Sequence, residues 1–417
     1  MPTPHTDCHF VPSHPAYQQP IRRRRRFMEG WYYRLTIPDV GSFAIIVSNE
    51  DPGRPRTSLA CIQVVGPHDQ YLVQADRDAT KFWAEKNAFG CVFAASGLDP
   101  KRTELGVDEW NEKVDSGFQI RPSVESHAFL GRIRGHDGTL GGVLDGQGVP
   151  GTCDFDFSVR SLCGWGDSDQ PSKSTGGWLA SFRVFEPHWQ VTMADGRATG
   201  VITWMNTTYD FVDAPFYAEK NWGAALPPKW YWTQCNAFEG YDQLSVTAGG
   251  GIRTIPFGRK ESLGMIGVHY DGTFFEAVPW TGNMEWEVET WGSWKLRGNS
   301  TLSRRPFAVE LEYSCDQETG LVFRAPTPDE GMVYFCRDTF EANTTLTLWE
   351  LESDGKEYMR KEPPLIDRAR STVGGAEVGG GPWWSTWKRT SSLKQPIRFL
   401  LRVPVRVSRT WRRLRGR

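Results

Sequence analysis

The sequence predicts an all-β protein in which two β units, barrels or sandwiches, pack together, and three observations support this prediction. Aromatic residues, which favour strands, are unusually common, with 19 Trp, 23 Phe and 12 Tyr in 417 residues. Short apolar or alternating segments recur along the chain, with Gly, Asp, Asn and Pro turns between them. Roughly seventeen such segments are more than one small barrel holds, so two β units are expected.

The segments divide the chain into four regions. Residues 1–26 form an irregular basic leader, 27–270 an N-terminal β-barrel domain with long loops, 271–390 a C-terminal β-barrel domain, and 391–417 a basic amphipathic tail. Strands begin at Phe27, and the later segments with strand character are 42–48, 59–65, 127–134, 153–159, 181–185, 189–193, 199–205, 208–212, 229–238, 244–248, 264–270, 273–280, 282–289, 292–298, 307–313, 332–337 and 344–351.

Helical patterns are few. Residues 78–86 and 104–114 are the best candidates, and both are short. Residues 135–152 and 164–177 are rich in Gly, Asp and Ser and are expected to be loops. Strand character is lost beyond Pro382.

Charge is distributed unevenly along the chain. The net charge is −2, yet residues 394–417 carry nine Lys or Arg and no acidic residue. Apolar residues alternate with these arginines, which favours a peripheral membrane or lipid-droplet surface as partner and disfavours nucleic acid. Pro404 excludes one uninterrupted helix, and a solvated tail remains the alternative. The sequence contains no run of about 18 apolar residues, so no membrane-spanning helix is expected.

Sequence motifs for cofactors and metals are absent. The eight Cys form no CxxC pair, and the chain has no HExxH, no GxGxxG before a helix and no P-loop. His5, Cys8, His9 and His14 cluster in a Pro-rich segment, but their spacing does not match known zinc sites. We therefore expect no cofactor and no metal.

Several blocks resemble the tocopherol cyclase family, in order and over most of the chain. They include FMEGWYYRLTIPD at 27–39, QYLVQADRDATKFWAEKN at 70–87, FEPHWQVTMADGRATG at 185–200, DAPFYAEKNWGAALPPKWYWTQCNAFEG at 213–240 and AEVGGGPWWSTWK at 376–388. The resemblance implies two lipocalin-like (calycin-type) antiparallel barrels and kinship with carotenoid hydratases. It also implies closure of the chromanol ring of a prenylated (phytyl or geranylgeranyl) benzoquinol in vitamin E biosynthesis.

The same resemblance implies a location. A photosynthetic eukaryote would keep such an enzyme in the plastid, at the plastoglobule or thylakoid surface, and a bacterium at the thylakoid or in the cytoplasm. No plastid transit peptide is visible, because the EGWYY block begins within the first 30 residues.

Ring closure requires an acid that protonates the prenyl alkene, and a buried carboxyl is the side chain suited to this. Glu219 is the first candidate, because it lies among aromatic residues and its Tyr217-Ala218-Glu219 step resembles the Tyr-x-Asp/Glu step of the hydratases. A structural alternative pairs Glu219 with Lys220 or with another cation across a strand. Glu29 is the rival acid, and Asp213 is a third candidate that is better suited to a turn.

Other residues are expected to serve the substrate. His188 would relay a proton or take one from the phenol, although a buried structural His is the alternative. Trp faces stabilise cations, and amide side chains hold hydroxyl groups. The substrate-binding candidates are Trp31, Tyr32, Trp189, Asn221, Trp222, Trp232 and Asn236.

Two other functions remain open from the sequence. A hydratase on the same scaffold would let water capture the cation, and a carrier would bind a prenylated lipid without reaction. The carrier needs no buried acid, so Glu219 separates it from the two enzymes.

Overall fold

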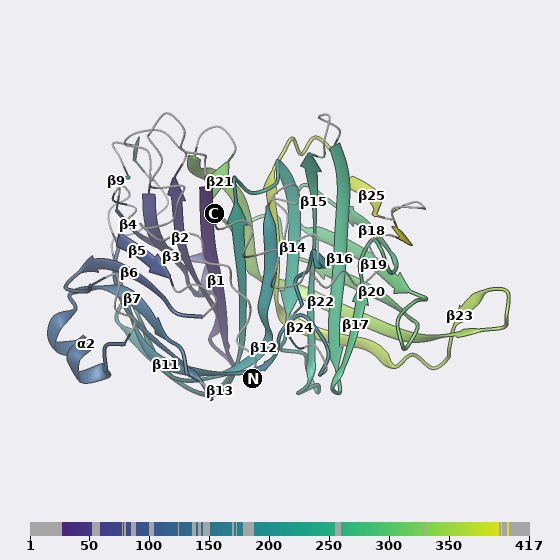
Figure 1. Cartoon of the computed structure of the whole chain (residues 1–417), viewed down its shortest axis with the longest axis horizontal. Coiled ribbons are helices and arrows are strands. Elements are labelled where there is room, and N and C mark those ends of the chain that lie inside the picture. Colours follow the sequence, from purple (N-terminus) through teal and green to yellow (C-terminus); the bar gives the residue numbers. More distant parts are fainter. Residues whose placement is uncertain are drawn as a thin grey trace, which may run out of the picture.

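The computed structural model describes residues 27–51, 59–76, 78, 81–84, 89–99, 104–123, 125–135, 139–140, 143–144, 151–168, 171, 173–177, 187–254, 260–327, 331–391, 393 and 398–399. Two large curled antiparallel sheets lie side by side, one with the purple to teal strands and one with the green to yellow strands (Figure 1). The predicted all-β fold of two lipocalin-like barrels is confirmed, each barrel being a strongly curled sheet.

The first sheet has eleven strands in the order β4-β3-β2-β1-β13-β12-β11-β8-β7-β6-β5. Their bounds are β1 Phe27–Ile37, β2 Gly41–Asp51, β3 Leu59–Val65, β4 Tyr71–Asp76, β5 Phe82–Ala84, β6 Cys91–Ser96, β7 Ser116–Arg121, β8 His127–Arg134, β11 Thr152–Cys163, β12 His188–Trp204 and β13 Thr207–Gly223. Strand β11 shows why these segments form the sheet: Phe155, Phe157 and Val159 are buried, whereas Asp156 and Ser158 between them are exposed.

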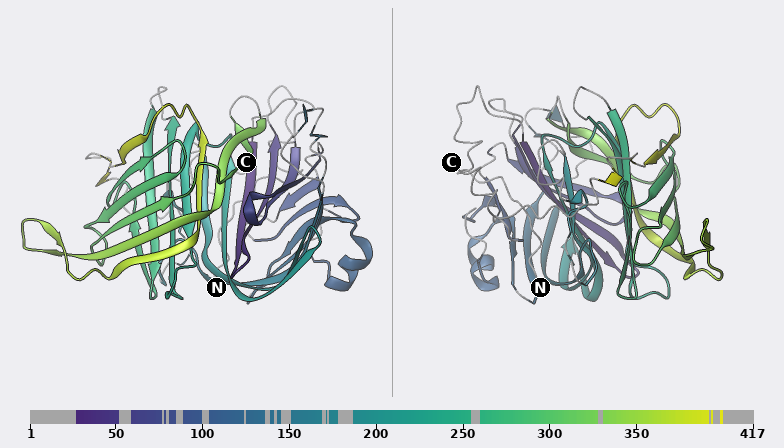
Figure 2. Two further views of the ribbon diagram at one scale, coloured as in Figure 1. Left: turned by 180° about the vertical axis from the view of Figure 1, so that it is seen from behind. Right: turned by 45° about the vertical axis from the view of Figure 1, so that its right-hand side comes forward.

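The second sheet has twelve strands, of which ten follow the order β17-β16-β15-β14-β24-β22-β20-β19-β18-β25 and two, β21 and β23, pair with β22. Their bounds are β14 Lys229–Cys235, β15 Leu244–Thr254, β16 Lys260–Tyr270, β17 Thr273–Ala277, β18 Asn283–Val288, β19 Ser293–Ser300, β20 Phe307–Ser314, β21 Leu321–Thr327, β22 Gly331–Ser353, β23 Tyr358–Arg360, β24 Ile366–Gly380 and β25 Trp387–Ser391. The long strands β22 and β24 carry β23 out beyond the body of the sheet (Figure 2).

The chain passes from the first sheet to the second between Gly223 and Lys229. The sequence-based division at 270/271 differs from this one, because strands β14 to β16 pair only within the second sheet in the described residues. Turn spacing locates strands along a sequence, but it does not tell which sheet a strand joins.

Of the two predicted helices, one is confirmed and one is wrong. Residues 104–114 contain the helix α2, Val107–Lys113, which buries Trp110. Residues 78–86 contain instead the strand β5, where Phe82 and Ala84 are fully buried against the first core. Packing of these apolar side chains overrides the local helical pattern.

Three further expectations concern loops and ends. Residues 135–152 contain the short strands β9, Thr139–Leu140, and β10, Val143–Leu144. The predicted loss of strand character beyond Pro382 is wrong, because β25 pairs with β18 and buries Trp387 in the second core. The predicted strand 181–185, the leader 1–26 and nearly all of the tail 394–417 lie outside the described residues.

Four apolar clusters of the described residues result from this arrangement, and the smallest packs Trp110 of α2 against β6 and β8. The other three are larger. One fills the curl of the first sheet, a second fills the curl of the second sheet, and a third lies between the two sheets. The third core includes Tyr32 and Tyr217 from the first sheet and Trp230 and Trp232 from the second. Within the described residues, no helix is long and apolar enough to span a membrane.

Candidate active site

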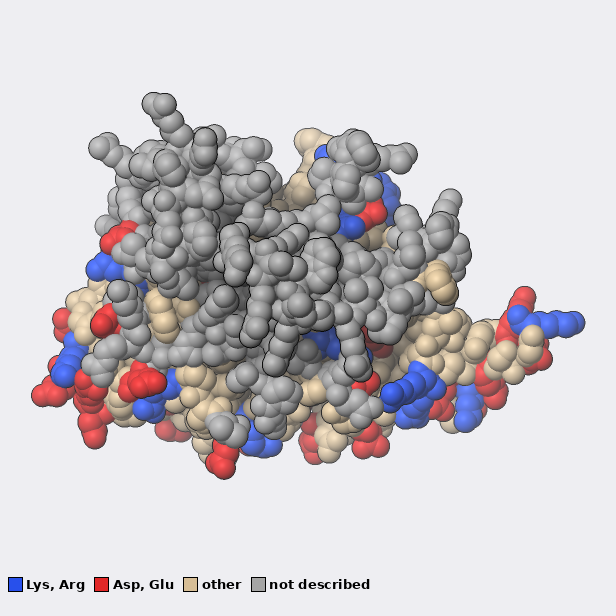
Figure 3. Space-filling view, in the orientation of Figure 1, with Lys and Arg blue, Asp and Glu red and all other residues tan. Residues whose placement is uncertain are grey.

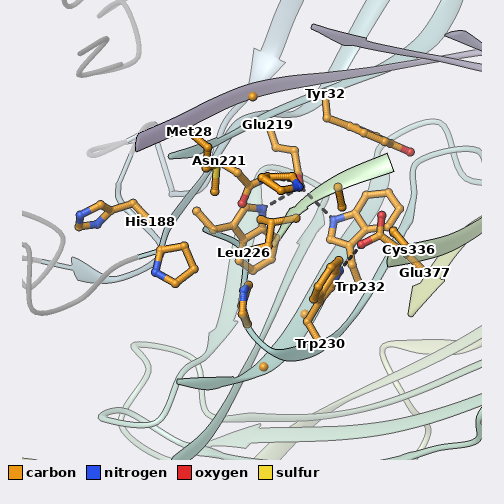
Figure 4. A pocket seen from close by; sticks show the side chains of 18 of the residues that line it. Met28, Tyr32, His188, Glu219, Asn221, Leu226, Trp230, Trp232, Cys336 and Glu377 are labelled. Carbon is orange, nitrogen blue, oxygen red and sulfur yellow. Dashed lines mark hydrogen bonds between the residues drawn. The ribbon is translucent and has the colours of Figure 1, made fainter. Parts of the chain in front are cut away.

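A cavity of about 220 Å³ lies between the two sheets, and both sheets contribute to its walls. Strands β1, β2, β3, β12 and β13 of the first sheet contribute lining residues, as do β14, β15, β16, β21, β22 and β24 of the second. Glu29, Glu219 and Glu377 are the carboxyl residues among its described lining, which is otherwise mostly apolar and aromatic. Figure 4 shows Glu219 and Glu377 with the indole rings of Trp230 and Trp232 beside them.

The alternation of side chains along β1 and β13 places Glu219 toward the second sheet. Successive residues of a strand point to opposite faces. On β13, Phe216 packs in the core of the first sheet and Tyr217 in the core between the sheets. On β1, Trp31 packs in the core of the first sheet and Tyr32 in the core between the sheets. Glu219, two residues beyond Tyr217, therefore faces the interface.

Glu219 is buried and accepts hydrogen bonds from four neutral groups. Its Oε2 atom receives the indole N–H of Trp189 at 2.7 Å, the hydroxyl of Tyr217 at 2.6 Å and the indole N–H of Trp232 at 2.9 Å. Its Oε1 atom receives the amide of Asn221 at 2.9 Å. Two of these donors come from β12 and β14, so residues of three strands surround one carboxyl group.

Burial raises the pKa of Glu219 above the usual range of a glutamate, although the four hydrogen bonds act in the opposite direction. Three donors occupy Oε2, whereas Oε1 has one. A carboxyl oxygen offers about two lone pairs, so a proton on Glu219 belongs on Oε1. Rotation of the Asn221 amide would then present its oxygen as the acceptor. The site thus accommodates both the acid and its conjugate base.

Glu29 also belongs to the cavity lining, but it shares a face of β1 with Trp31, which packs in the core of the first sheet, and it has a different partner there. Lys220 Nζ forms a salt bridge with Glu29 Oε1, and both side chains are fully buried. The same ammonium group lies over the rings of Trp31, at 4.6 Å, and Trp222, at 5.4 Å. His188 stacks on Trp222 with ring centroids 5.0 Å apart. The alternative that paired Lys220 with Glu219 is wrong, because the two adjacent residues point to opposite faces.

Of two other predicted substrate residues, one lines the cavity and one does not. Tyr32 lines the cavity and meets Trp232 edge-on, with ring centroids 5.2 Å apart. Asn236 does not reach the cavity. Its amide donates to Asp195 Oδ1 and to the Phe216 carbonyl, each at 3.0 Å, so its side chain is engaged in structural contacts.

Many residues that line the cavity were not anticipated, and three of them bear on its chemistry. Glu377, Trp230 and Cys336 come from the second sheet, and Trp230 donates its indole N–H to Glu377 Oε1. Burial raises the pKa of Glu377 to about 7. The spacing of Trp230 and Trp232 gave a usable signal, because residues two apart in a strand share a face. Glu377 lies in the resemblance block 376–388, but its nearest neighbours are mostly Ala, Val and Gly and lack the aromatic signal seen around Glu219.

Known proteins resemble this chain over nearly its full length. The family model described as tocopherol cyclase-like matches residues 25–380. The chloroplastic tocopherol cyclase of Zea mays is 37% identical over 424 residues, which cover 97% of this chain and 83% of the maize protein. A probable chloroplastic tocopherol cyclase of Oryza sativa subsp. japonica is also 37% identical, with coverage of 97% and 84%.

Solved structures resemble the chain more remotely. The crystal structure of CghA with Sch210972 has a TM-score of 0.46 and 10% identity, over 86% of this chain and 89% of that one. Kievitone hydratase from Nectria haematococca has a TM-score of 0.40 and 12% identity, over 91% and 96%. Similarity at this level carries no functional argument. The family match and the two plant relatives show that the chain belongs to the tocopherol cyclase-like family of enzymes.

Proposed function

We propose that the protein is a tocopherol cyclase that closes the chromanol ring of a prenylated benzoquinol by acid catalysis, without a cofactor. The observation that carries the proposal is Glu219, a buried carboxyl with a raised pKa whose described partners are all neutral. Such a group can hold a proton at rest and deliver it into an aromatic cavity. The tocopherol cyclase names of the two plant relatives support the choice of substrate.

The reaction balances with one proton. Glu219 Oε1 gives its proton to the alkene carbon nearer the ring, and the alkene π electrons form the new C–H bond. The tertiary carbon becomes a cation, the phenol oxygen bonds to it, and the phenol proton leaves. No electrons are gained or lost, so the product is an isomer of the substrate.

The residues around Glu219 would assist each stage. Tyr217, Trp189 and Trp232 stabilise the carboxylate that remains after protonation, because each donates a hydrogen bond to Oε2. Trp189 and Trp232 also bring aromatic rings close to the acid, where a ring face stabilises a cation. Tyr32 adds a third ring on the β1 side.

The product of the wild-type protein tests the assignment. Incubation with 2,3-dimethyl-6-phytyl-hydroquinone should give a chromanol of unchanged mass, measured by mass spectrometry. A product heavier by one water would identify a hydratase, and recovery of bound but unreacted quinol would identify a carrier. Either of these two results would contradict the cyclase proposal.

We also propose a plastid location and contact with a lipid surface, since both plant relatives are chloroplastic and the substrate is lipophilic. In the described part of the face in Figure 3, basic and acidic side chains are interspersed. The proposal for the basic tail therefore rests on its sequence. A chain truncated after Leu393 should co-sediment less with anionic liposomes than the full chain, and equal binding would exclude the tail from docking.

A further inference from the structure

Two tryptophans on one strand each bind a carboxyl group of a different sheet. Trp230 and Trp232 are two residues apart on β14, so their side chains share a face. Trp232 donates its indole N–H to Glu219 of the first sheet, at 2.9 Å. Trp230 donates its indole N–H to Glu377 of the second sheet. Both carboxyl groups line the same cavity (Figure 4).

The sheet register fixes Glu377 in this position. Glu377 on β24 lies directly opposite Trp232 on β14 and opposite Asp338 on β22. Trp230 lies opposite Gly379, where an added Cβ would come within 2.0 Å of the Trp230 ring. The absence of a side chain at 379 therefore lets the Trp230 indole cross β24 toward Glu377.

The surroundings of Glu377 allow it to exist in both protonation states. Burial raises its pKa, and the hydrogen bonds from Trp230 and Cys336 oppose the increase, so that the pKa is about 7. Negative charge on Glu219 is a smaller contribution to the same increase. The charge of Glu377 also acts on Asp338 of β22, whose pKa burial raises, and on Tyr32 of β1. Arg34 of β1 opposes the increase in pKa at both of these groups. Glu377 can thus take up a proton near neutral pH.

The proposed reaction needs a group that accepts the phenol proton as the ring closes, and Glu219 does not fill this role. As the phenol oxygen bonds to the tertiary carbon, its O–H bond must break, and an acceptor must lie within hydrogen-bond reach. Glu219 has just given its proton to the alkene carbon and is held by four donors. A second carboxylate in the same cavity would accept the phenol proton.

We infer that Glu377 is this second group: its carboxylate accepts a hydrogen bond from the attacking phenol hydroxyl and takes the proton as the ring closes. The inference rests on the proposed cyclase function. One O–H bond of the substrate breaks, one C–O bond forms, and Glu377 becomes a carboxylic acid. After the product leaves, Glu377 loses a proton to water and Glu219 gains one, which restores the starting state.

The experiment compares the full-length wild type with Glu377→Gln, which keeps size and one hydrogen-bonding oxygen. We expect kcat for chromanol formation to fall by about 10²–10⁴-fold, while quinol binding, followed by Trp fluorescence, changes by only a few-fold. Wild-type kcat should fall as the pH drops below about 7, because Glu377 is then protonated, and this acid-side decline should vanish in the variant.

Glu276→Gln is the matched control, since Glu276 is a carboxyl that accepts the indole N–H of Trp165, at 2.6 Å, and does not line the cavity. Its kcat and pH profile should match the wild type. A Glu377→Gln protein with wild-type kcat and an unchanged acid-side decline would overturn the role of Glu377.

A second readout separates this result from failure of the cyclase proposal. In a Glu219→Gln background, which blocks turnover, quinol should bind several-fold more tightly above pH 7 than below it, because a charged acceptor strengthens the phenol hydrogen bond. The double variant Glu219→Gln, Glu377→Gln should lose this pH dependence. Retention of the same dependence would overturn the inference, whatever product the wild type makes.

Discussion

The strand pair β1 and β13 carries a buried carboxyl group on each face, and the two groups have different partners. Toward the first core, Glu29 pairs with the Lys220 ammonium, and two Trp rings lie around that cation. Toward the second sheet, Glu219 receives four neutral donors. Glu29 therefore has a buried cationic partner, whereas the described partners of Glu219 are all neutral. Burial alone therefore does not distinguish the two carboxyl groups, because they differ in the charge of their partners.

The largest effect on stability is expected on the Glu29 face. Lys220→Met should lower the free energy of unfolding by about 3–5 kcal/mol, because it leaves the Glu29 charge buried without its partner. The double variant Lys220→Met, Glu29→Gln should regain part of that loss. Urea denaturation would measure both, and a Lys220→Met protein as stable as the wild type would remove the contrast between the faces.

A smaller effect, on the pH dependence of kcat, is expected when the indole donor to Glu219 or the indole donor to Glu377 is removed. Trp232→Phe removes a hydrogen bond that favours ionised Glu219, so the pKa of Glu219 should rise. In the proposed reaction Glu219 must be protonated, so the alkaline decline of kcat should move to higher pH by about 1 unit. Trp230→Phe should instead raise the pKa of Glu377 and move the acid-side decline upward.

The pair of Trp variants is best compared in one pH–rate series. Each variant serves as the control of the other, because both lose an indole N–H from the same face of β14. If the two variants shifted the same limbs of the pH–rate profile by the same amount, the indoles would act only through packing.

The smallest effect on activity is expected at Asn236, the predicted substrate residue that the fold places elsewhere. Asn236→Ala removes the donor to Asp195 and to the Phe216 carbonyl, so stability should fall by about 1–2 kcal/mol. The kcat and KM values should remain within about twofold of the wild type, since surface and core contacts away from the cavity act through stability. A large loss of kcat would place Asn236 in the site after all.

Much of the fold could be predicted from the sequence, because strand alternation is local. The segments 59–65 and 127–134 coincide with β3 and β8. Residues 213–223 were not anticipated as strand, since Asp, Pro, Lys and Asn interrupt their apolar pattern, yet they continue β13. Had that strand been assigned, its alternation would have excluded a pair between Glu219 and Lys220.

The part of the site that could not be predicted depends on contacts between distant strands. Glu219 was predicted as the acid from its aromatic neighbours and the family resemblance, and the structure adds its four donors from three strands. Glu377 reaches the cavity through the β14–β24 register, which joins residues about 150 positions apart. Local pattern carries no information about such a pairing.

The central claim is that Glu219 supplies the proton, and the Glu219→Gln variant tests it most directly. Gln keeps the shape of the side chain but has no acidic proton to give. We expect chromanol formation to fall by at least about 10²–10⁴-fold, with quinol binding changed by only a few-fold and Glu276→Gln active as the control. Chromanol formation at the wild-type rate in Glu219→Gln would contradict the account.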